Sequence, residues 1–184
     1  MKKFLYLTFI AALFINAPAF AQKEKTVMVG GAAMYPSKNI VQNAVNSKDH
    51  TTLVAAVKAA GLVETLQSAG PFTVFAPTNA AFKKLPAGTV ETLLQPEQKA
   101  ALTGVLTYHV VAGKISAKQL MKKIKDGKGT TTLKTVAGGM LTFMRKGNVI
   151  MIKDEKGGVA TITISDVNQS NGVIHVINRV LLPS

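Results

Sequence analysis

The sequence predicts one α+β domain, with helices in its first half and a β meander in its second. Three observations support this class. The chain has 184 residues, the size of about one domain, and 47% of them are hydrophobic, which is enough for one core. Apolar residues recur at helical spacing in the first half, and short β-branched runs separated by paired glycines follow beyond residue 129. Cysteine is absent, so the stability of the fold must come from packing without disulfides.

The first 21 residues are predicted to be a signal peptide. Lys2 and Lys3 precede an almost wholly apolar stretch, and Ala19-Phe20-Ala21 has the small-x-small pattern found before a cleavage site. This stretch is too short to cross a hydrocarbon core of about 30 Å, and no later segment reaches the roughly 18 apolar residues of a membrane span. We therefore expect an exported protein, periplasmic or secreted, that is soluble after cleavage and begins at Gln22.

Basic residues strongly outnumber acidic ones. The chain holds 22 Lys and Arg against 9 Asp and Glu, and loss of Lys2 and Lys3 with the signal peptide would leave 20 against 9, a formal +11. Only Arg145 and Arg179 are arginine, the residue that suits bidentate recognition of phosphates and bases, so sequence-specific nucleic-acid binding is disfavoured. A lysine-rich surface favours loose attraction to anionic glycans, envelope polymers or an anionic membrane surface.

The first half of the mature chain is predicted to be mainly helical. Residues 22–38 show no sustained period and are expected to be an irregular lead-in, and residues 39–184 are expected to form the domain. Asp49 is the expected N-cap of a helix that ends at Gly61, and a short helix around residues 62–66 follows.

A short buried strand and one helical turn come next. Residues 72–75 are β-branched and aromatic and are closed by Pro77, which indicates a strand. Thr78 or Asn79 is the expected cap of a turn that points Phe82 inward. Capping is a simpler role for this pair than ligand binding.

Two further helices are expected before the β half. One starts near Pro96, a residue favoured at the first helical position, and a strand from Tyr108 to Val111 follows it. Ser116 and Gln119 have the spacing of a capping box, and the helix that they begin ends at Asp126-Gly127.

The remaining chain is predicted to form hairpins. Turns are indicated by Gly138-Gly139, Gly147-Asn148 and Gly157-Gly158. The last run, Val173 to Leu182, has no breaker before Pro183 and suggests a central strand. The other expected strands span residues 133–136, 140–144, 149–153 and 159–164.

The sequence contains no recognisable catalytic or metal-binding constellation. Its three histidines show no metal-ligand spacing, and no nucleophile elbow or phosphate-binding loop occurs. His109 and His175 lie in apolar runs and are expected to be buried with polar partners, whereas His50 is expected to be a surface or capping residue. Asp154-Glu155 lies between lysines, which indicates a solvated turn. We therefore expect a protein that is not an enzyme, with no catalytic residue, no metal site and no cofactor.

Three ordered blocks of residues resemble those of the fasciclin domain family. Gly70 to Phe82 is similar to the first signature block, Tyr108-His109 to the tyrosine-histidine pair, and Asn171 to Asn178 to the second block. The resemblance extends from about Asn39 to Pro183 and favours the secreted single-domain bacterial type. It implies a wedge-shaped β-sandwich flanked by a lobe of short helices, and an adhesion or interaction module outside the cytoplasm.

The resemblance also marks a set of motif residues. In animal members the tyrosine-histidine pair and residues near the second block are linked to integrin binding. In the expected strand, side-chain alternation would let at most one of Tyr108 and His109 face solvent, so we expect a mainly structural role, with partner contact as the alternative. The motif residues are Thr78, Asn79, Tyr108, His109, Asn171, Gly172 and His175.

Two functions are consistent with these features. The first is adhesion through cell-surface or extracellular proteins or anionic polymers, with Lys118, Lys122 and Lys125 forming one exposed basic face of the helix after Ser116. A merely solvated face is the alternative reading of these lysines. The second function is a carrier of an apolar small molecule such as a carotenoid or lipid, which some family members are. Its one hint is the set of flexible methionines, Met28, Met34, Met121, Met140, Met144 and Met151, although ordinary core filling also explains them.

Overall fold

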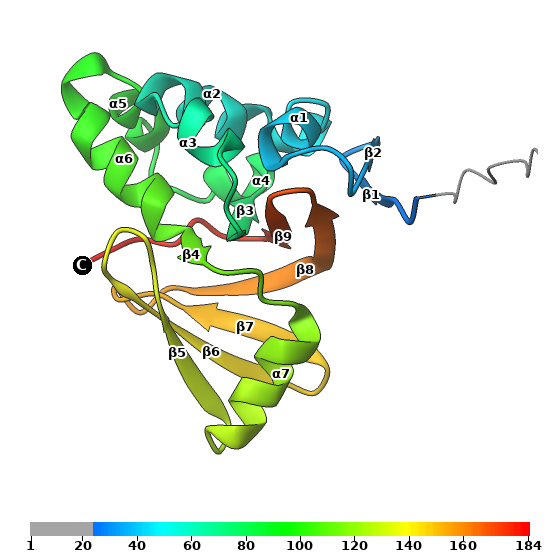
Figure 1. The fold of residues 1–184 in the computed structure, drawn as a ribbon. Helices are drawn as coiled ribbons and strands as arrows, with labels where there is room; N and C mark the ends of the chain where they lie inside the picture. The colour runs from blue at the N-terminus through cyan, green and yellow to red at the C-terminus, as the bar shows by residue number, and fades with distance from the viewer. Residues whose placement is uncertain (1–23) are drawn as a thin grey trace, which may run out of the picture.

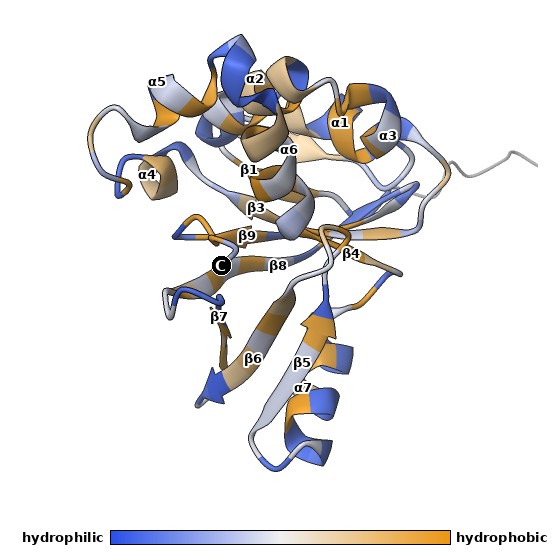
Figure 2. Cartoon of the chain, turned by 90° about the vertical axis from the view of Figure 1, so that its left-hand side faces the viewer, coloured by the Kyte–Doolittle hydropathy of each residue, from blue (hydrophilic) through white to orange (hydrophobic). Residues whose placement is uncertain are grey.

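The computed structural model describes residues 24–184, and the predicted signal peptide lies outside the described residues (Figure 1). A lobe of short helices lies on one side of a twisted sheet, and one further helix lies at the opposite end (Figures 1 and 2). The α+β class expected from the sequence is confirmed. None of the helices in residues 24–184 has the length and apolar character needed to span a bilayer.

The helical lobe is built from elements of the first half of the chain. It begins with a hairpin of β1 (Val27–Val29) and β2 (Ala32–Met34). The helices are α1 (Ile40–Ala44), α2 (Thr51–Ala60), α3 (Val63–Gln67), α4 (Asn79–Phe82), α5 (Thr89–Leu93) and α6 (Lys99–Tyr108). Single 3-10 turns precede the two longest helices of this lobe, α2 and α6; these turns span Lys48–His50 and Pro96–Gln98.

The main sheet has seven strands in the order β4-β3-β9-β8-β7-β6-β5. Its β3–β9 pair is parallel, and its other pairs are antiparallel. The last helix, α7 (Ala117–Asp126), lies beside β5 to β7 at the end of the molecule away from the helical lobe (Figure 1). The strands are β3 (Phe72–Pro77), β4 (Val110–Ala112), β5 (Thr130–Lys134), β6 (Met140–Lys146), β7 (Val149–Lys153), β8 (Val159–Gln169) and β9 (Gly172–Ile177).

Two apolar cores lie on opposite sides of β3 and β9. Val74 and Ile174 pack with the helical lobe, whereas Phe75 and Ile177 pack with α7 and the β5–β7 strands, which together we call the sheet lobe. Because both faces of β3 and β9 are covered, these strands are continuous apolar runs rather than alternating ones. This burial explains why a central strand late in the chain could be predicted.

The lead-in is more regular than the sequence suggested. The expectation of irregular structure over residues 22–38 is wrong for residues 27–34, which form the β1–β2 hairpin. Gly30 and Gly31 both have positive φ values, 57° and 78°, and form its two-residue turn. Two consecutive glycines therefore make the tight turn possible.

Several other boundaries differ from the expectation. β5 spans Thr130–Lys134 instead of 133–136, and β8 continues to Gln169 instead of ending at 164. The helix α6 continues through Tyr108, so no strand starts there, and Asp49 lies in a 3-10 turn rather than capping α2.

β9 ends at Ile177 rather than Leu182. The Asn178 amide still donates to the Thr161 carbonyl oxygen of β8 at 3.2 Å, but amides further along the chain bind side chains. The amide of Leu181 donates to His109, and that of Leu182 donates to Asp154.

Candidate functional site

His109 connects the end of α6 to the C-terminal segment. Its Nδ1 lies 2.8 Å from the Val105 carbonyl oxygen and donates to it, because a carbonyl only accepts. Its Nε2, 2.9 Å from the Leu181 amide nitrogen, accepts a hydrogen bond from that amide. The side chain is 3% exposed, and burial lowers its pKa to about 4. The neutral imidazole therefore links two backbone groups inside the fold.

Tyr108 is also fully buried, so neither member of the pair faces solvent, which agrees with the expected limit of at most one. The expected strand is wrong, because the pair sits at a helix end. The Tyr108 hydroxyl donates to the Met140 carbonyl oxygen at 2.9 Å and accepts from the Glu155 amide at 3.1 Å. Burial raises its pKa.

The adjacent carboxylates do not form a solvated turn as predicted. Asp154 is only 5% exposed, and its two oxygens accept hydrogen bonds from the amides of Gly158 and Leu182. Glu155 is exposed but accepts from the amides of Met140 and Ser184, which lowers its pKa. The turn carboxylates therefore bind the C-terminal strand extension, a long-range contact that local sequence does not reveal.

Thr78 and Asn79 lie where the helices α2 and α4 begin. The Thr78 hydroxyl caps α4 by accepting from the Ala81 amide at 3.2 Å, as expected. The Asn79 side chain accepts from the Thr52 amide at 3.0 Å and donates to the Lys48 carbonyl oxygen at 2.9 Å. Asn79 thereby caps the start of α2, a helix that lies close to it in space although it is distant in the sequence.

Asn171 and Gly172 hold the helical lobe against the sheet. The Asn171 oxygen accepts from the Ile40 amide at 3.0 Å, and its nitrogen donates to the carbonyl oxygens of Leu66 and Ser68 at 2.8 and 2.9 Å. Gly172 is required because a Cβ at this position would lie 2.1 Å from the Phe72 carbonyl oxygen. Both residues are buried and contact three elements between them.

His175 connects β9 to the start of α7. Its Nε2 donates to the Ile115 carbonyl oxygen at 2.9 Å, and its Nδ1 accepts from the Asp166 amide at 3.3 Å. The Asp166 carboxylate in turn accepts from the first amide of α7, that of Ala117, at 2.8 Å. Burial lowers the pKa of His175, and its ring stacks on Phe75 with centroids 5.7 Å apart.

The seven motif residues therefore lie at separate junctions rather than in one exposed cluster. Six of them use their polar atoms or missing side chain to join elements far apart in sequence, whereas Thr78 caps α4 locally. Within residues 24–184 no three His, Asp or Glu side chains are grouped so as to hold a metal ion. The five buried residues of the set present almost no surface to a partner, whereas Thr78 and Asn79 are half-buried. The surfaces open to a partner lie mainly elsewhere.

One such surface is the outer face of α7. The capping box of Ser116 and Gln119 forms as predicted, and Leu120 and Ile124 are fully buried against the sheet lobe. Lys118, Lys122 and Lys125 all lie exposed, as the helical spacing predicts. Lys122 pairs with Asp126 at 2.7 Å, which is the one ion pair in residues 24–184. This pair offsets part of the repulsion between lysines that lie one helical turn apart.

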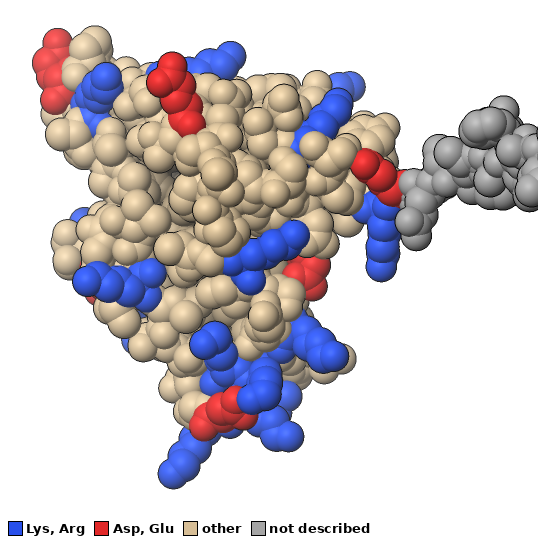
Figure 3. Space-filling view, viewed as in Figure 1, with Lys and Arg blue, Asp and Glu red and all other residues tan. Residues whose placement is uncertain are grey.

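The charge is concentrated around this helix. Residues 109–156, which include α7 and the β5–β7 strands, carry eleven basic and three acidic side chains, whereas residues 39–108 carry five and four. The last two residues of β6 add two more cations beside the end of α7, because Met144 pairs with Thr130 at the start of β5. Figure 3 shows the blue side chains gathered at the end of the molecule that holds α7. We call these residues the basic tip: Lys118, Lys122, Lys123, Lys125, Lys128, Arg145 and Lys146.

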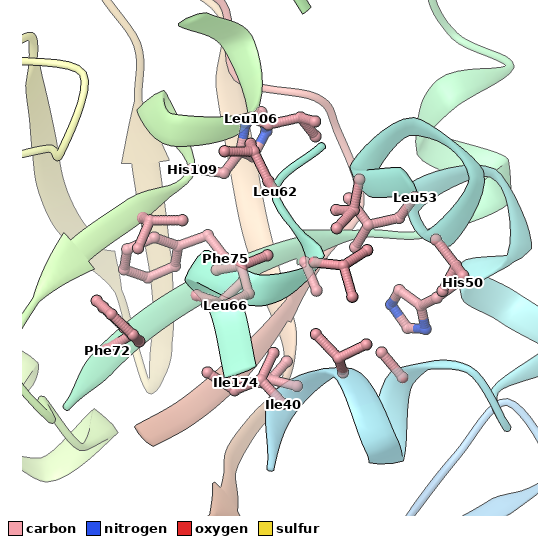
Figure 4. A pocket seen from close by; sticks show the side chains of 18 of the residues that line it. Ile40, His50, Leu53, Leu62, Leu66, Phe72, Phe75, Leu106, His109 and Ile174 are labelled. Carbon is pink, nitrogen blue, oxygen red and sulfur yellow. The ribbon is translucent and has the colours of Figure 1, made fainter. Parts of the chain in front are cut away.

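A second feature is an apolar cavity of about 90 Å³ inside the helical lobe (Figure 4). The expectation that His50 is a surface or capping residue is wrong, since His50 is buried and lines this cavity. Of the methionines that suggested an apolar carrier, Met34 lines the cavity, and Met28 and Met140 are exposed. Sequence reasoning missed the cavity because its walls come from α1, α2, α3, α6 and six strands, with no local pattern in common.

Comparison with known proteins agrees with this geometry. The fasciclin domain family matches residues 48–183. The chain is 49% identical to "Protein sll1483" of Synechocystis sp. over 160 residues, which cover 87% of this chain and 82% of that protein. It is 34% identical to "Cell surface glycolipoprotein MPB83" of Mycobacterium bovis, over 84% of this chain and 64% of that protein.

A solved structure of the same family shares the fold of this chain. A FAS1 domain pair from the insect cell adhesion molecule Fasciclin I matches with a TM-score of 0.70 at 18% sequence identity, over 80% of this chain and 52% of that one. The likeness shows a shared fold, with a seven-strand sheet and short helices. With the match of the family to residues 48–183 and the relatives above, the chain belongs to the fasciclin domain family.

Proposed function

We propose that this protein is an exported, non-enzymatic interaction module of the adhesion type, and that its basic tip binds anionic polymers of the cell envelope or extracellular space. The observation that carries the proposal is the uneven charge, with eleven basic and three acidic residues in 109–156. The names of two matched proteins, a cell surface glycolipoprotein and a cell adhesion molecule, support a location and role outside the cytoplasm.

The lysines are held on a rigid support. The start of α7 is fixed by its capping box and by the Asp166 carboxylate, and its inner face is fixed by Leu120 and Ile124. The backbone positions that carry the outer lysines therefore keep a defined spacing, while the side chains themselves stay flexible. Fixed charges of one sign attract a polyanion over distances of about 8 Å at physiological salt. Because lysine is a compact point charge, this contact discriminates charge density more than sequence or stereochemistry.

A non-enzymatic role is supported by the state of the polar groups. The buried histidines 109 and 175 have both ring nitrogens engaged with the protein, and the Asp154 carboxylate accepts two backbone hydrogen bonds. Groups used in this way maintain the fold and have no free position for a substrate.

Binding to a carboxylated polysaccharide, polygalacturonate, tests the proposal, with neutral dextran as the probe that should not bind. We expect the affinity of the exported protein to fall steeply between about 50 mM and about 500 mM salt, because screening shortens the range of the attraction. The triple variant Lys118→Glu, Lys122→Glu and Lys125→Glu should lose most of the binding at low salt.

A matched variant separates the basic tip from net charge. Lys48→Glu, Lys83→Glu and Lys99→Glu change the total charge equally but alter exposed lysines of the helical lobe. This control should bind nearly as well as the parent protein. Equal loss in both triple variants, or none in either, would contradict a local site. Binding only to phosphatidylglycerol vesicles, and not to the polysaccharide, would assign the basic tip to a membrane surface instead.

The carrier of an apolar small molecule remains the second candidate function. One structural observation favours it, the apolar cavity of the helical lobe. This cavity is remote from α7, because its walls contain no residue of the basic tip.

A further inference from the structure

The cavity between α1, α2, α3 and α6 and the strands β3 and β9 has almost wholly hydrocarbon walls. Ile40, Leu53, Leu66 and Ile174 point into it from four different elements (Figure 4). Protein interiors are normally packed without such voids, and small-molecule sites combine apolar walls with a few placed polar groups. A void of about 90 Å³ in the core of a small domain therefore requires an explanation.

His50 supplies one polar group on this wall. Its side chain is 3% exposed, and its Nδ1 lies 2.9 Å from the Ser47 hydroxyl oxygen. Its Nε2 has no hydrogen-bond partner. Among the buried side-chain nitrogens and oxygens of residues 24–184, it is the one atom without a partner. Leaving such an atom unpaired costs about 1 to 3 kcal/mol, so an unpaired buried nitrogen marks a place where a partner fits.

The other histidine of the wall provides the contrast. His109 also lines the cavity, but Val105 and Leu181 occupy both of its nitrogens. The carbonyl of Ala76 lies close enough to His50 to raise its pKa but does not complete a hydrogen bond, and burial outweighs this effect and lowers the pKa overall. A neutral His50 favours an uncharged partner.

The wall is not closed to solvent. Val136, in the turn between β5 and β6, lines the cavity and is 52% exposed, and the lining residues Lys58 of α2 and Thr65 of α3 are also exposed. These exposed lining residues mark where the cavity meets the surface.

We propose that this cavity binds one small, uncharged, mainly hydrocarbon molecule whose single hydroxyl or carbonyl group hydrogen-bonds to His50 Nε2. The inference deepens the second candidate function and is independent of the basic tip. The hydrocarbon part fills the apolar walls, and the polar group pairs the one nitrogen that the protein leaves free.

Two probes of equal shape test this assignment. Cyclohexanol and methylcyclohexane differ in one hydroxyl against one methyl group, and binding of each is followed by NMR shifts of the valine, leucine and isoleucine methyl groups. We expect both probes to shift the methyl signals of cavity residues in the parent protein. In His50→Phe, cyclohexanol should bind about tenfold more weakly, the size of one lost hydrogen bond, while methylcyclohexane should bind as before. Retained methylcyclohexane binding also shows that the variant is folded.

A second pair of variants keeps the proposal testable if His50→Phe does not fold. Ala44 lines the cavity, and Ala59 lies exposed on α2 outside it. Ala44→Phe should abolish binding of both probes by filling the space, and Ala59→Phe should leave it unchanged. If neither probe shifts the methyl signals of cavity residues, the proposed site is wrong. If cyclohexanol binds equally well to the parent protein and to His50→Phe, only a water molecule pairs His50 Nε2. The triple lysine variant should keep probe binding, so failure here is distinct from failure of the basic tip.

Discussion

The helical lobe and the sheet lobe use polar residues in opposite ways. Around the helical lobe, the side chains of Asn79, His109 and Asn171 are turned inward and satisfy backbone groups of distant elements, and the surface is almost neutral. In the sheet lobe, α7 buries only apolar side chains and turns its lysines outward. The comparison separates the residues that make this chain a fasciclin domain from those that distinguish its surface. Substitutions in the first group should cost stability, and substitutions in the second should cost binding.

The largest loss of stability is expected at Gly172. In Gly172→Ala the new Cβ would meet the Phe72 carbonyl oxygen at 2.1 Å and force apart the parallel β3–β9 pair. We expect a loss of about 4 kcal/mol or more in the free energy of unfolding, or no folded protein. Urea denaturation measures it.

A glycine elsewhere provides the control. Gly104 lies within α6, and a Cβ there would meet nothing within 4 Å. Gly104→Ala should stabilise the protein by about 0.5 to 1 kcal/mol, because alanine is the better helix former. Equal stability of the Gly172 and Gly104 variants would show that the β3–β9 contact does not limit the fold.

The second largest loss of stability is expected on acidification, which protonates the buried histidines of the junctions. The pKa of His109 is about 4 in the folded protein and 6.5 in its unfolded reference state, so the unfolded chain binds more protons between these values. The contribution of His109 to the free energy of unfolding is complete above pH 6.5. It is lost as the pH falls toward 4, by about 3 kcal/mol in total. The lowered pKa values of His50 and His175 act in the same direction.

Urea midpoints at several pH values measure this effect. His109→Gln should show a clearly smaller loss of stability on acidification than the parent protein. The triple lysine variant should show the parent's pH dependence, because it keeps all three histidines. A His109→Gln profile that matches the parent's would mean that His109 is not the group that links stability to pH.

Asn171 tests a single junction. Asn171→Ala leaves the Ile40 amide and the carbonyl oxygens of Leu66 and Ser68 without their partner. We expect a loss of about 2 to 3 kcal/mol in the free energy of unfolding. Asn168 is exposed and bonds only to a nearby carbonyl oxygen, so Asn168→Ala should change stability by less than about 0.5 kcal/mol. Similar losses for the two asparagines would contradict the junction role.

The junctions also show what the sequence could and could not predict. The turns, the capping box of α7 and the central strand were predictable because each depends on residues a few positions apart: Ser116 with Gln119, or Gly157 with Gly158. Burial of His109 and His175 was predictable from their apolar neighbours. Their partners were not, because Leu181 lies 72 residues from His109 and Ile115 lies 60 from His175.

The errors have the same origin. Asp154 was expected in solvent because its neighbours are lysines, yet the C-terminal segment supplies it with an amide donor. His50 was expected at the surface because it precedes a helix, yet the walls of the cavity close around it from other elements. In each case a contact between distant segments overrides the local pattern.

The smallest change in stability is expected at the basic tip. The triple variant Lys118→Glu, Lys122→Glu and Lys125→Glu removes one exposed ion pair, with Asp126, and buries nothing new. Its free energy of unfolding, measured by urea denaturation, should lie within about 0.5 kcal/mol of the parent's, because exposed ion pairs contribute little. A large destabilisation would mean that these lysines belong to the scaffold and that the two lobes do not differ as described.

Lysine acetylation of the protein with and without polygalacturonate, read by mass spectrometry, tests most directly whether the basic tip is the surface that binds. The account predicts that the polymer slows modification of Lys118, Lys122 and Lys125 several-fold and leaves that of Lys48, Lys83 and Lys99 unchanged, since the first three lie on α7 and the others on the helical lobe. Equal protection of both sets, or protection of the helical lobe alone, would contradict it.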